Sequence, residues 1–330
     1  MIAFFKQKSP ANIVLLLIFA LLIKLPLFLY PQLVQPTEED GQLYHAFVAL
    51  FSSANDNGFS YAVASFLLLF TQALLINYVV NEQRMTNRQT FLPAMSYLLI
   101  TSLLPEWNYL SAPLVATLFV IWAFIKLFNL YNVAASNGLI FNIGMLLGIS
   151  SFIYFPSIAF VLCLFLGLMI LRPFRMNELV LLVVGIFTPY YFYVVYLFLT
   201  DKLVWANLLP VISFRLNELS NSIWIAAAVA LTGIPFIMGG YYVQTHLRKM
   251  LIQARKNWSI LLLYLVLSVI IPFVNTEMSW HNWVLAAAPF AAFHAPAYLY
   301  PKKRILPALL FFLTVGFILF VQYGTPVWKQ

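Results

Sequence analysis

Charged residues are what this chain has least of. Only 8% of its 330 residues are Asp, Glu, Lys or Arg, whereas 63% are hydrophobic. A soluble domain carries roughly a quarter charged residues, so this chain cannot cover itself with a water-exposed surface. It has one cysteine, Cys163, inside an apolar run, which excludes a disulfide framework and a cysteine metal site. It has no glycine-rich phosphate loop and no Ser-His-Asp pattern, so nothing expected of an ATPase is present.

The positions of the polar residues exclude two further kinds of site. A net charge of +8 is compatible with nucleic-acid binding. The basic residues, however, lie in short gaps beside apolar runs, where they set membrane topology, so we expect no nucleic-acid partner. The four histidines, His45, His246, His281 and His294, show no metal-ligand spacing. We therefore expect no zinc site and no cofactor, while a divalent metal stays open.

Long apolar runs fill most of the chain. Most of them are about long enough to cross a hydrocarbon core of ~30 Å as a helix. Pro156 divides the longest run into two, because proline starts a helix well and breaks its interior. The pattern predicts an all-α, multi-pass membrane protein with a single integral membrane domain over residues 1–330. The predicted spans, about eleven, are 11–30, 60–80, 91–104, 110–130, 139–155, 156–171, 179–199, 222–243, 258–273, 282–299 and 305–322.

The charges are sorted by side. Fourteen of the 18 Lys and Arg residues lie in one alternating set of gaps, and the other four are Lys24, Lys202, Arg215 and Lys329. Because cytoplasmic loops carry an excess of basic residues, this pattern predicts a cytoplasmic N-terminus and, after eleven spans, a periplasmic C-terminus. We expect the location to be a bacterial inner membrane. Two outer gaps are long, 31–60 and 200–221, so a polar substrate is expected on the outer face.

The first outer gap contains the acidic trio Glu38-Glu39-Asp40. After Gly41, apolar residues follow at helical spacing, which predicts an amphipathic helix lying in the plane of the interface, capped by Thr37 or Glu38. Two interpretations of the trio stay open: a solvated, capped loop, or a general base or metal-binding carboxylate facing a pocket. The apolar positions of the predicted helix are Leu43, Phe47, Leu50 and Phe51, with Tyr44 and Val48 adjacent.

Lys24 lies inside the first predicted span. A charge there is costly unless the side chain reaches the interface or is paired. Either Lys24 extends to the outer headgroups, or it faces a polar cavity and pairs with a carboxylate of the trio or with a phosphate. Arg215 and Lys202, in the second long gap, are either solvated loop charges or ligands of an anionic group.

At these residues the chain resembles the GT-C-fold glycosyltransferases, polytopic enzymes that use polyprenyl-phosphate-linked sugars. The similarity lies in a basic inner start, a first span ending Ile23-Lys-Leu-Pro-Leu-Phe28, an outer acidic cluster, Tyr44 and the predicted in-plane helix. A Gly-Met-Leu-Leu-Gly-Ile-Ser segment that begins at Gly144 and the segment His281-Asn-Trp-Val-Leu-Ala-Ala-Ala-Pro-Phe are also similar to that family. An uncharacterised bacterial membrane family related to the fold is equally compatible.

The resemblance implies an inverting glycosyltransferase that moves a sugar from a lipid-linked donor to an acceptor on the outer face. It implies Asp40, or else Glu39, as the catalytic base. Cationic neutralisation of the donor phosphate would fall to Lys24, His281 or Arg215. Tyr44 and His45 are further candidates for binding substrate.

Two other functional classes stay beside the enzyme. The chain has no soluble acceptor-binding domain and few outer cations, so a structural or assembly subunit of a cell-envelope complex is the alternative, with envelope proteins as partners besides membrane lipids. An ion-coupled transporter should show paired repeats and ionisable residues in mid-span. No repeat is clear in this sequence, and Lys24 is the only charge well inside a predicted span besides Lys126, which is near an inner end, so a transporter is disfavoured.

Overall fold

The protein is all-helical over the residues that the computed structural model describes, with no strand among them. These residues are 2–7, 9, 11–34, 36–37, 40–51, 58–133, 136–201, 223–274, 279–303 and 305–324. The α-helices are α1 Ile2–Phe5, α2 Ala11–Ile23, α3 Leu25–Leu29, α4 Gln42–Ala49, α5 Phe59–Glu82, α6 Leu92–Ile100, α7 Ala112–Phe128, α8 Asn137–Ile153, α9 Phe160–Leu171, α10 Met176–Leu199, α11 Ile223–His246, α12 Ile252–Ile270, α13 Ala287–Leu299 and α14 Ile305–Leu319. Shorter turns are η1 Pro105–Trp107, η2 Phe155–Ala159, η4 Leu247–Lys249, η5 Ile271–Val274, η6 Trp280–Ala286 and η7 Phe320–Gly324.

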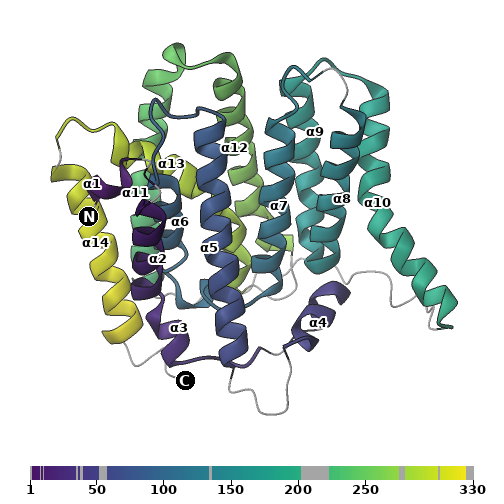
Figure 1. Ribbon diagram of the computed structural model, residues 1–330, viewed down its shortest axis with the longest axis horizontal. Helices are drawn as coiled ribbons and strands as arrows, with labels where there is room; N and C mark the ends of the chain where they lie inside the picture. Colours follow the sequence, from purple (N-terminus) through teal and green to yellow (C-terminus); the bar gives the residue numbers. More distant parts are fainter. Residues whose placement is uncertain are drawn as a thin grey trace.

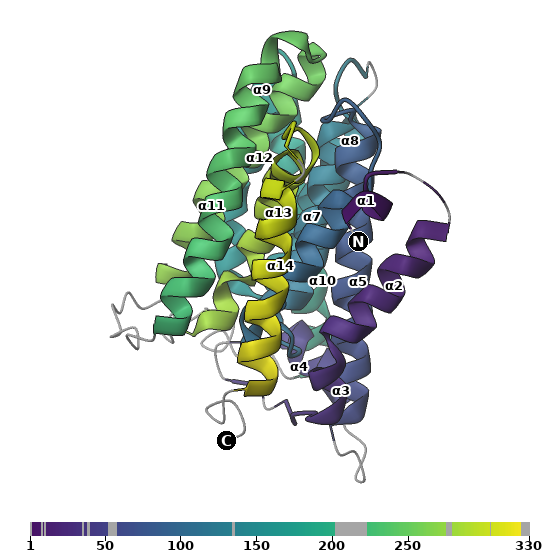
Figure 2. The ribbon, with the colours of Figure 1, turned by 90° about the vertical axis from the view of Figure 1, so that its left-hand side faces the viewer.

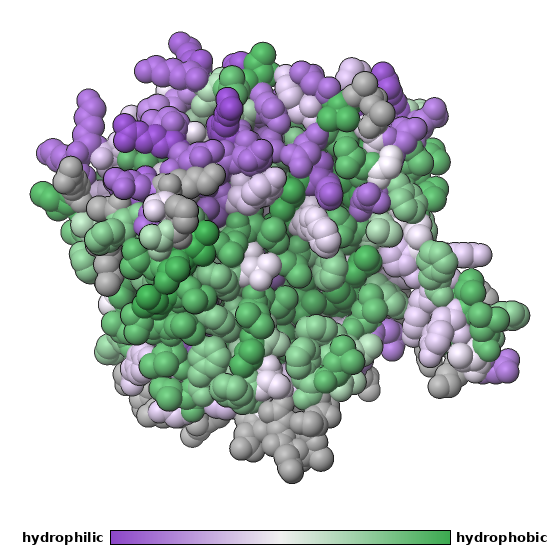
Figure 3. All heavy atoms as spheres, viewed as in Figure 1, coloured by the Kyte–Doolittle hydropathy of each residue, from purple (hydrophilic) through white to green (hydrophobic). Residues whose placement is uncertain are grey.

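Long apolar helices confirm a membrane-embedded protein. Within the described part of the chain, five helical segments are long and apolar enough to cross a bilayer. On the face in Figure 3, hydrophilic side chains gather at the upper end, while hydrophobic side chains cover the middle of the molecule. The five segments are Phe59–Glu82, Met176–Leu199, Ile223–Lys249, Ile252–Phe273 and Ile305–Tyr323.

The helices form a bundle with its long elements side by side (Figure 1). Contacts run in the order α11, α13, α6, α5, α7, α8 and α10, so α11 and α10 stand at the two ends of this series. In the view turned by 90°, α14 stands beside α13, and α2 leans against the same side of the bundle (Figure 2). The helix α4 lies at the lower end of Figure 1, together with α3.

Prolines break the apolar runs at defined places. The predicted division at Pro156 is confirmed, since α8 ends at Ile153 and η2 begins with Phe155-Pro156. The first run, expected as one span, is interrupted at Lys24, because Pro26 cannot continue the hydrogen-bond ladder of α2 into α3. The helix α6 has only nine residues, all buried, and at 1.5 Å per residue it is about 14 Å long.

The start of α4 corrects one prediction. Its N-cap is Gly41 rather than Thr37 or Glu38, and its first turn holds no acidic residue. The reason is a close backbone approach: Gly41 N–H donates to the Ile153 carbonyl over 2.9 Å, and a Cβ on Gly41 would lie 2.1 Å from the Phe152 carbonyl oxygen. Only glycine fits there, so the end of α8 determines where α4 begins.

Candidate functional site

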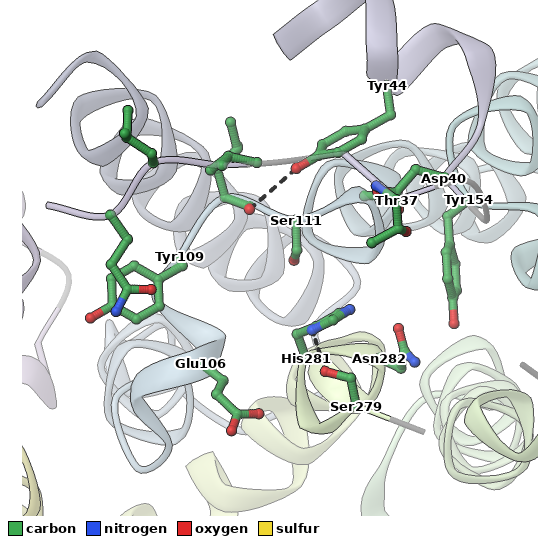
Figure 4. Close-up of a pocket in the computed structure, with 15 residues that line it drawn as sticks. Thr37, Asp40, Tyr44, Glu106, Tyr109, Ser111, Tyr154, Ser279, His281 and Asn282 are labelled. Carbon is green, nitrogen blue, oxygen red and sulfur yellow. Dashed lines mark hydrogen bonds between the residues drawn. The ribbon is translucent and has the colours of Figure 1, made fainter. Parts of the chain in front are cut away.

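A polar cavity of about 270 Å³ lies at the end of the bundle that carries α4. Its walls come from the segment before α4, from η1 and the start of α7, from Tyr154 at the end of α8, and from η6 (Figure 4). Segments more than 200 residues apart in sequence therefore meet in one place. The lining residues are Gln32, Leu33, Val34, Thr37, Asp40, Tyr44, Glu106, Tyr109, Leu110, Ser111, Ala112, Tyr154, Ser279, His281 and Asn282.

Asp40, the carboxylate predicted as catalytic base, lines this cavity. A tight turn holds it: the Thr37 backbone N–H donates to Asp40 Oδ2 over 2.9 Å, and the Asp40 backbone N–H donates to the Thr37 carbonyl over 3.1 Å. Gly41, the next residue, is anchored to the end of α8 as described above. Asp40 is thus positioned by backbone on both sides.

Tyr44 lies one helical turn further, at the first buried position of α4. Its hydroxyl donates to the Leu110 carbonyl over 3.2 Å, which ties α4 to the start of α7 (Figure 4). Burial, and next the charge of Asp40, raise the pKa of Tyr44 far above its ordinary value of 10.0. Tyr44 therefore acts as a neutral hydroxyl. His45, the neighbouring candidate, is half-buried and does not line the cavity.

His281 enters the cavity from η6, as Figure 4 shows. Its Nδ1 is hydrogen-bonded to the hydroxyl of Ser279. Burial lowers the pKa of His281 from 6.5 to about 4. The imidazole is therefore neutral near pH 7, so it offers a hydrogen bond rather than the positive charge expected for a phosphate ligand.

Glu106 is a cavity residue that the sequence alone did not single out. It is the first acidic residue of η1, and burial raises the pKa of its carboxyl group above 4.5, although a hydrogen bond from the Trp280 backbone acts in the opposite direction. In the sequence, nothing distinguishes Glu106 from the other acidic residues of the predicted outer gaps. Only its position directly after Pro105, in the short segment that follows the buried helix α6, could have drawn attention to it.

Lys24 is fully buried but lies away from this lining. Its Nζ donates to Thr101 Oγ1 over 3.0 Å, to Ser102 Oγ over 3.1 Å and to Asn108 Oδ1 over 2.5 Å. The side chain therefore does not extend to the headgroups, which corrects that interpretation, and among the described residues it pairs with no carboxylate. Instead it ties the break between α2 and α3 to the segment around η1. Pairing with a phosphate stays a prediction.

The structure thus brings three of the predicted residues, Asp40, Tyr44 and His281, to one cavity and leaves Lys24 and His45 outside its lining. Their functional roles stay predictions. Glu39 and Arg215, together with Lys202, lie outside the described residues.

A second cavity, of about 400 Å³, lies behind η1 and η6 and is almost wholly apolar. One wall separates the two cavities: Glu106 and His281 line the polar cavity, and their neighbours Trp107 and Trp280 line the apolar one. Trp107 Nε1 donates to the Trp280 carbonyl over 2.6 Å across this wall. The apolar lining is Leu103, Leu104, Trp107, Ala228, Val229, Thr232, Gly233, Phe236, Ile237, Val269, Trp280, Trp283, Ala286 and Phe290.

Among the described residues, no group of three or more His, Cys, Asp or Glu could hold a metal ion. Comparison of the chain with protein-family models, with curated proteins and with solved structures gives no match. The resemblance to GT-C glycosyltransferases therefore rests on the sequence features given above, and the site has to be interpreted from its own chemistry.

Proposed function

We propose that the protein is a membrane glycosyltransferase of GT-C type that transfers a sugar from a polyprenyl-phosphate-linked donor to an acceptor on the outer face of a bacterial inner membrane. The proposal includes about eleven spans, a cytoplasmic N-terminus, a periplasmic C-terminus and α4 lying in the plane of the outer interface. Exposed Leu43 on α4 and exposed Leu50, which follows its last residue, support contact of α4 with lipid.

The observation that carries the proposal is that a polar cavity, which Asp40 lines, lies directly beside an apolar cavity. A lipid-linked sugar has the same two parts, a polar head and a hydrocarbon chain. The head would occupy the polar cavity, whose lining of carboxyl, amide and hydroxyl groups suits a sugar. The chain would occupy the apolar cavity, where Val229 and Ile237 are also exposed on the outer surface of α11 and so give it access from the bilayer.

Asp40 is the proposed base. It would take the proton from an acceptor hydroxyl while that oxygen bonds to the anomeric carbon. The bond from this carbon to the phosphate oxygen breaks, its electron pair stays on the phosphate, and the configuration inverts. The described lining holds no Lys or Arg, so the charge on the leaving phosphate needs a cation from elsewhere. Arg215 stays the predicted candidate.

The test is Asp40→Asn, with Asp201→Asn as the matched control because Asp201 is exposed and outside the cavity lining. Release of polyprenyl phosphate from a polyprenyl-phosphate hexose is measured in proteoliposomes, with a membrane extract as the source of acceptor. Loss of a general base lowers such a rate by about 10²–10⁴-fold. We expect this loss for Asp40→Asn and none for the control, at unchanged thermal stability.

Lipids that co-purify with the protein supply an independent readout. A polyprenyl-phosphate glycan identified by mass spectrometry supports the enzyme. Wild-type protein that releases no polyprenyl phosphate and retains only bulk phospholipid would contradict it and would favour a structural or assembly subunit of an envelope complex.

A further inference from the structure

Glu106 is a second carboxyl group in the polar cavity, on a different wall from Asp40 (Figure 4). The residue is half-buried, and its Oε2 is sealed inside the protein without a hydrogen-bond partner among the described residues. A buried polar atom without a partner destabilises the folded protein, and a charged one does so more strongly. A charged carboxylate is therefore a poor occupant of this position, and a neutral carboxylic acid is a better one.

The wall that carries Glu106 is rigidly held. The Trp280 backbone in η6 is hydrogen-bonded to the Glu106 carboxyl group in η1. In the other direction, Trp107 Nε1 in η1 donates to the Trp280 carbonyl. Lys24 holds Asn108, two residues beyond Glu106, and the Asn108 N–H closes η1 by donating to the Pro105 carbonyl. Side chains that bind or react with a ligand require this kind of support, because a shift of a fraction of an ångström spoils their geometry.

The surroundings also favour the acid form. Asp40 is the other acidic residue of the described lining, and its negative charge opposes a second one in the same cavity. His281 is neutral near pH 7, and no Lys or Arg belongs to that lining. The buried cation Lys24, which contacts the segment around η1, is bonded to neutral oxygens. The titratable groups that share the cavity with Glu106 are Asp40, Tyr44, Tyr109, Tyr154 and His281.

We propose that Glu106 is a ligand-binding carboxylic acid whose Oε1 hydroxyl donates a hydrogen bond to an oxygen of the sugar or of its phosphate in the polar cavity, while the sealed Oε2 stays the neutral carbonyl oxygen. The ligand rests on the proposed function, whereas the protonated state does not. The two carboxyl groups of the cavity then have opposite tasks: Asp40 accepts a proton, and Glu106 donates a hydrogen bond without losing its proton.

Two substitutions separate this role from that of a second base. Glutamine keeps the size of Glu106 and a donor group, whereas alanine removes both. We expect Glu106→Gln to keep the affinity for a polyprenyl-phosphate hexose within about threefold, and Glu106→Ala to lose about tenfold or more, as expected for the loss of one hydrogen bond of ~1.4 kcal/mol. Affinity is measured as thermal stabilisation of the full-length protein in nanodiscs by increasing amounts of the lipid.

Infrared difference spectroscopy supplies a readout that does not depend on turnover. At pH 7 the wild type should show the carbonyl band of a protonated carboxylic acid, Glu106→Gln should lack it, and Asp40→Asn should retain it. Addition of the polyprenyl-phosphate hexose should shift the band. If Glu106→Gln leaves the acid bands unchanged, or weakens binding as much as Glu106→Ala does, the proposal is wrong.

The outcomes also separate this inference from the proposed function. A band that shifts with the lipid, in a protein that transfers no sugar, retains the inference and rejects the glycosyltransferase. A wild type that is not stabilised by the lipid rejects the proposed function together with the ligand assigned to Glu106. The infrared band then still decides whether Glu106 is protonated.

Discussion

The two cavities share one wall and have opposite chemistry. Along η1 and η6, adjacent residues face opposite ways: Glu106 and His281 line the polar cavity, and Trp107 and Trp280 line the apolar one. The polar cavity is assembled from segments that are distant in the sequence, whereas the apolar cavity is formed largely by α11, η6 and the start of α13. A short wall that is polar on one side and aromatic on the other is thus the feature that divides this end of the molecule.

The shared wall between the two cavities has its own support. Its hydrogen bonds cross between η1 and η6, and Lys24 binds η1 from the break between α2 and α3. A change in the wall should therefore disturb both cavities, while a change in a remote lining element should disturb only one.

The largest effect is expected from Lys24→Ala, which removes the support common to both cavities. The side chain is fully buried and holds Thr101, Ser102 and Asn108. Truncation of a large buried side chain costs about 2–5 kcal/mol, and a loss in that range is expected here. Thermal unfolding in detergent measures it, with the exposed Lys302→Ala as control. Equal unfolding temperatures for the two variants would mean that Lys24 does not stabilise the wall between the cavities.

Gly41→Ala should disturb the polar cavity alone. The new Cβ would lie 2.1 Å from the Phe152 carbonyl oxygen, so α4 must move away from the end of α8 and take Asp40 and Tyr44 with it. We expect a cost of about 1–3 kcal/mol and lost transfer activity. Gly138→Ala is the control, because its Cβ meets nothing within 4 Å. An active Gly41→Ala protein of wild-type stability would contradict the close approach.

Gly233→Leu should disturb the apolar cavity alone. Gly233 lines that cavity, and a Cβ there meets nothing within 4 Å, so a larger side chain fills the space without displacing backbone. We expect the affinity for a polyprenyl-phosphate hexose to fall about tenfold, or ~1.4 kcal/mol, at unchanged stability. Gly240→Leu lies on the same helix, outside the cavity and equally uncrowded. Equal affinities of the two variants would place the hydrocarbon chain elsewhere.

The smallest expected effect is a pH dependence of the folding stability, and it is caused by titratable groups of the polar cavity. The folded-state pKa of His281 is lowered to about 4, so the unfolded chain binds a proton first as pH falls below 6.5, and stability decreases. Between pH 7 and 5.5 this loss is about 1 kcal/mol, and His281→Asn should abolish it. The measurement is the free energy of unfolding at several pH values.

Glu106 should change the free energy of unfolding with pH in the direction opposite to His281. Its folded-state pKa is raised above 4.5, so the unfolded chain releases its proton first as pH rises above that value, and stability decreases with rising pH. Glu106→Gln should remove this slope and leave that of His281 intact. The exposed Glu82→Gln is the control. If both cavity variants change the pH dependence in the same direction, the two groups have been given the wrong protonation states.

Part of this site could be predicted from the sequence. The acidic trio before Gly41 directed attention to Asp40, and the gap before Trp283 directed it to His281; both residues line the polar cavity. Glu106 was missed, because nothing in its neighbours shows that η1 is packed against η6. The partners of Lys24 were missed for the same reason, since Thr101 and Asn108 lie 77 and 84 residues further along the chain.

The sequence by itself determined that the protein is helical and embedded in a membrane, and that its longest apolar run is divided at Pro156. These properties follow from residues close together in the chain: apolar runs bury themselves in hydrocarbon, and proline ends a hydrogen-bond ladder. Only the tertiary structure decided that Gly41 must begin α4, that Lys24 supports a wall, and that Glu106 faces one cavity while Trp107 faces another. Those outcomes depend on which distant segments come into contact, and such contacts leave no local pattern to read.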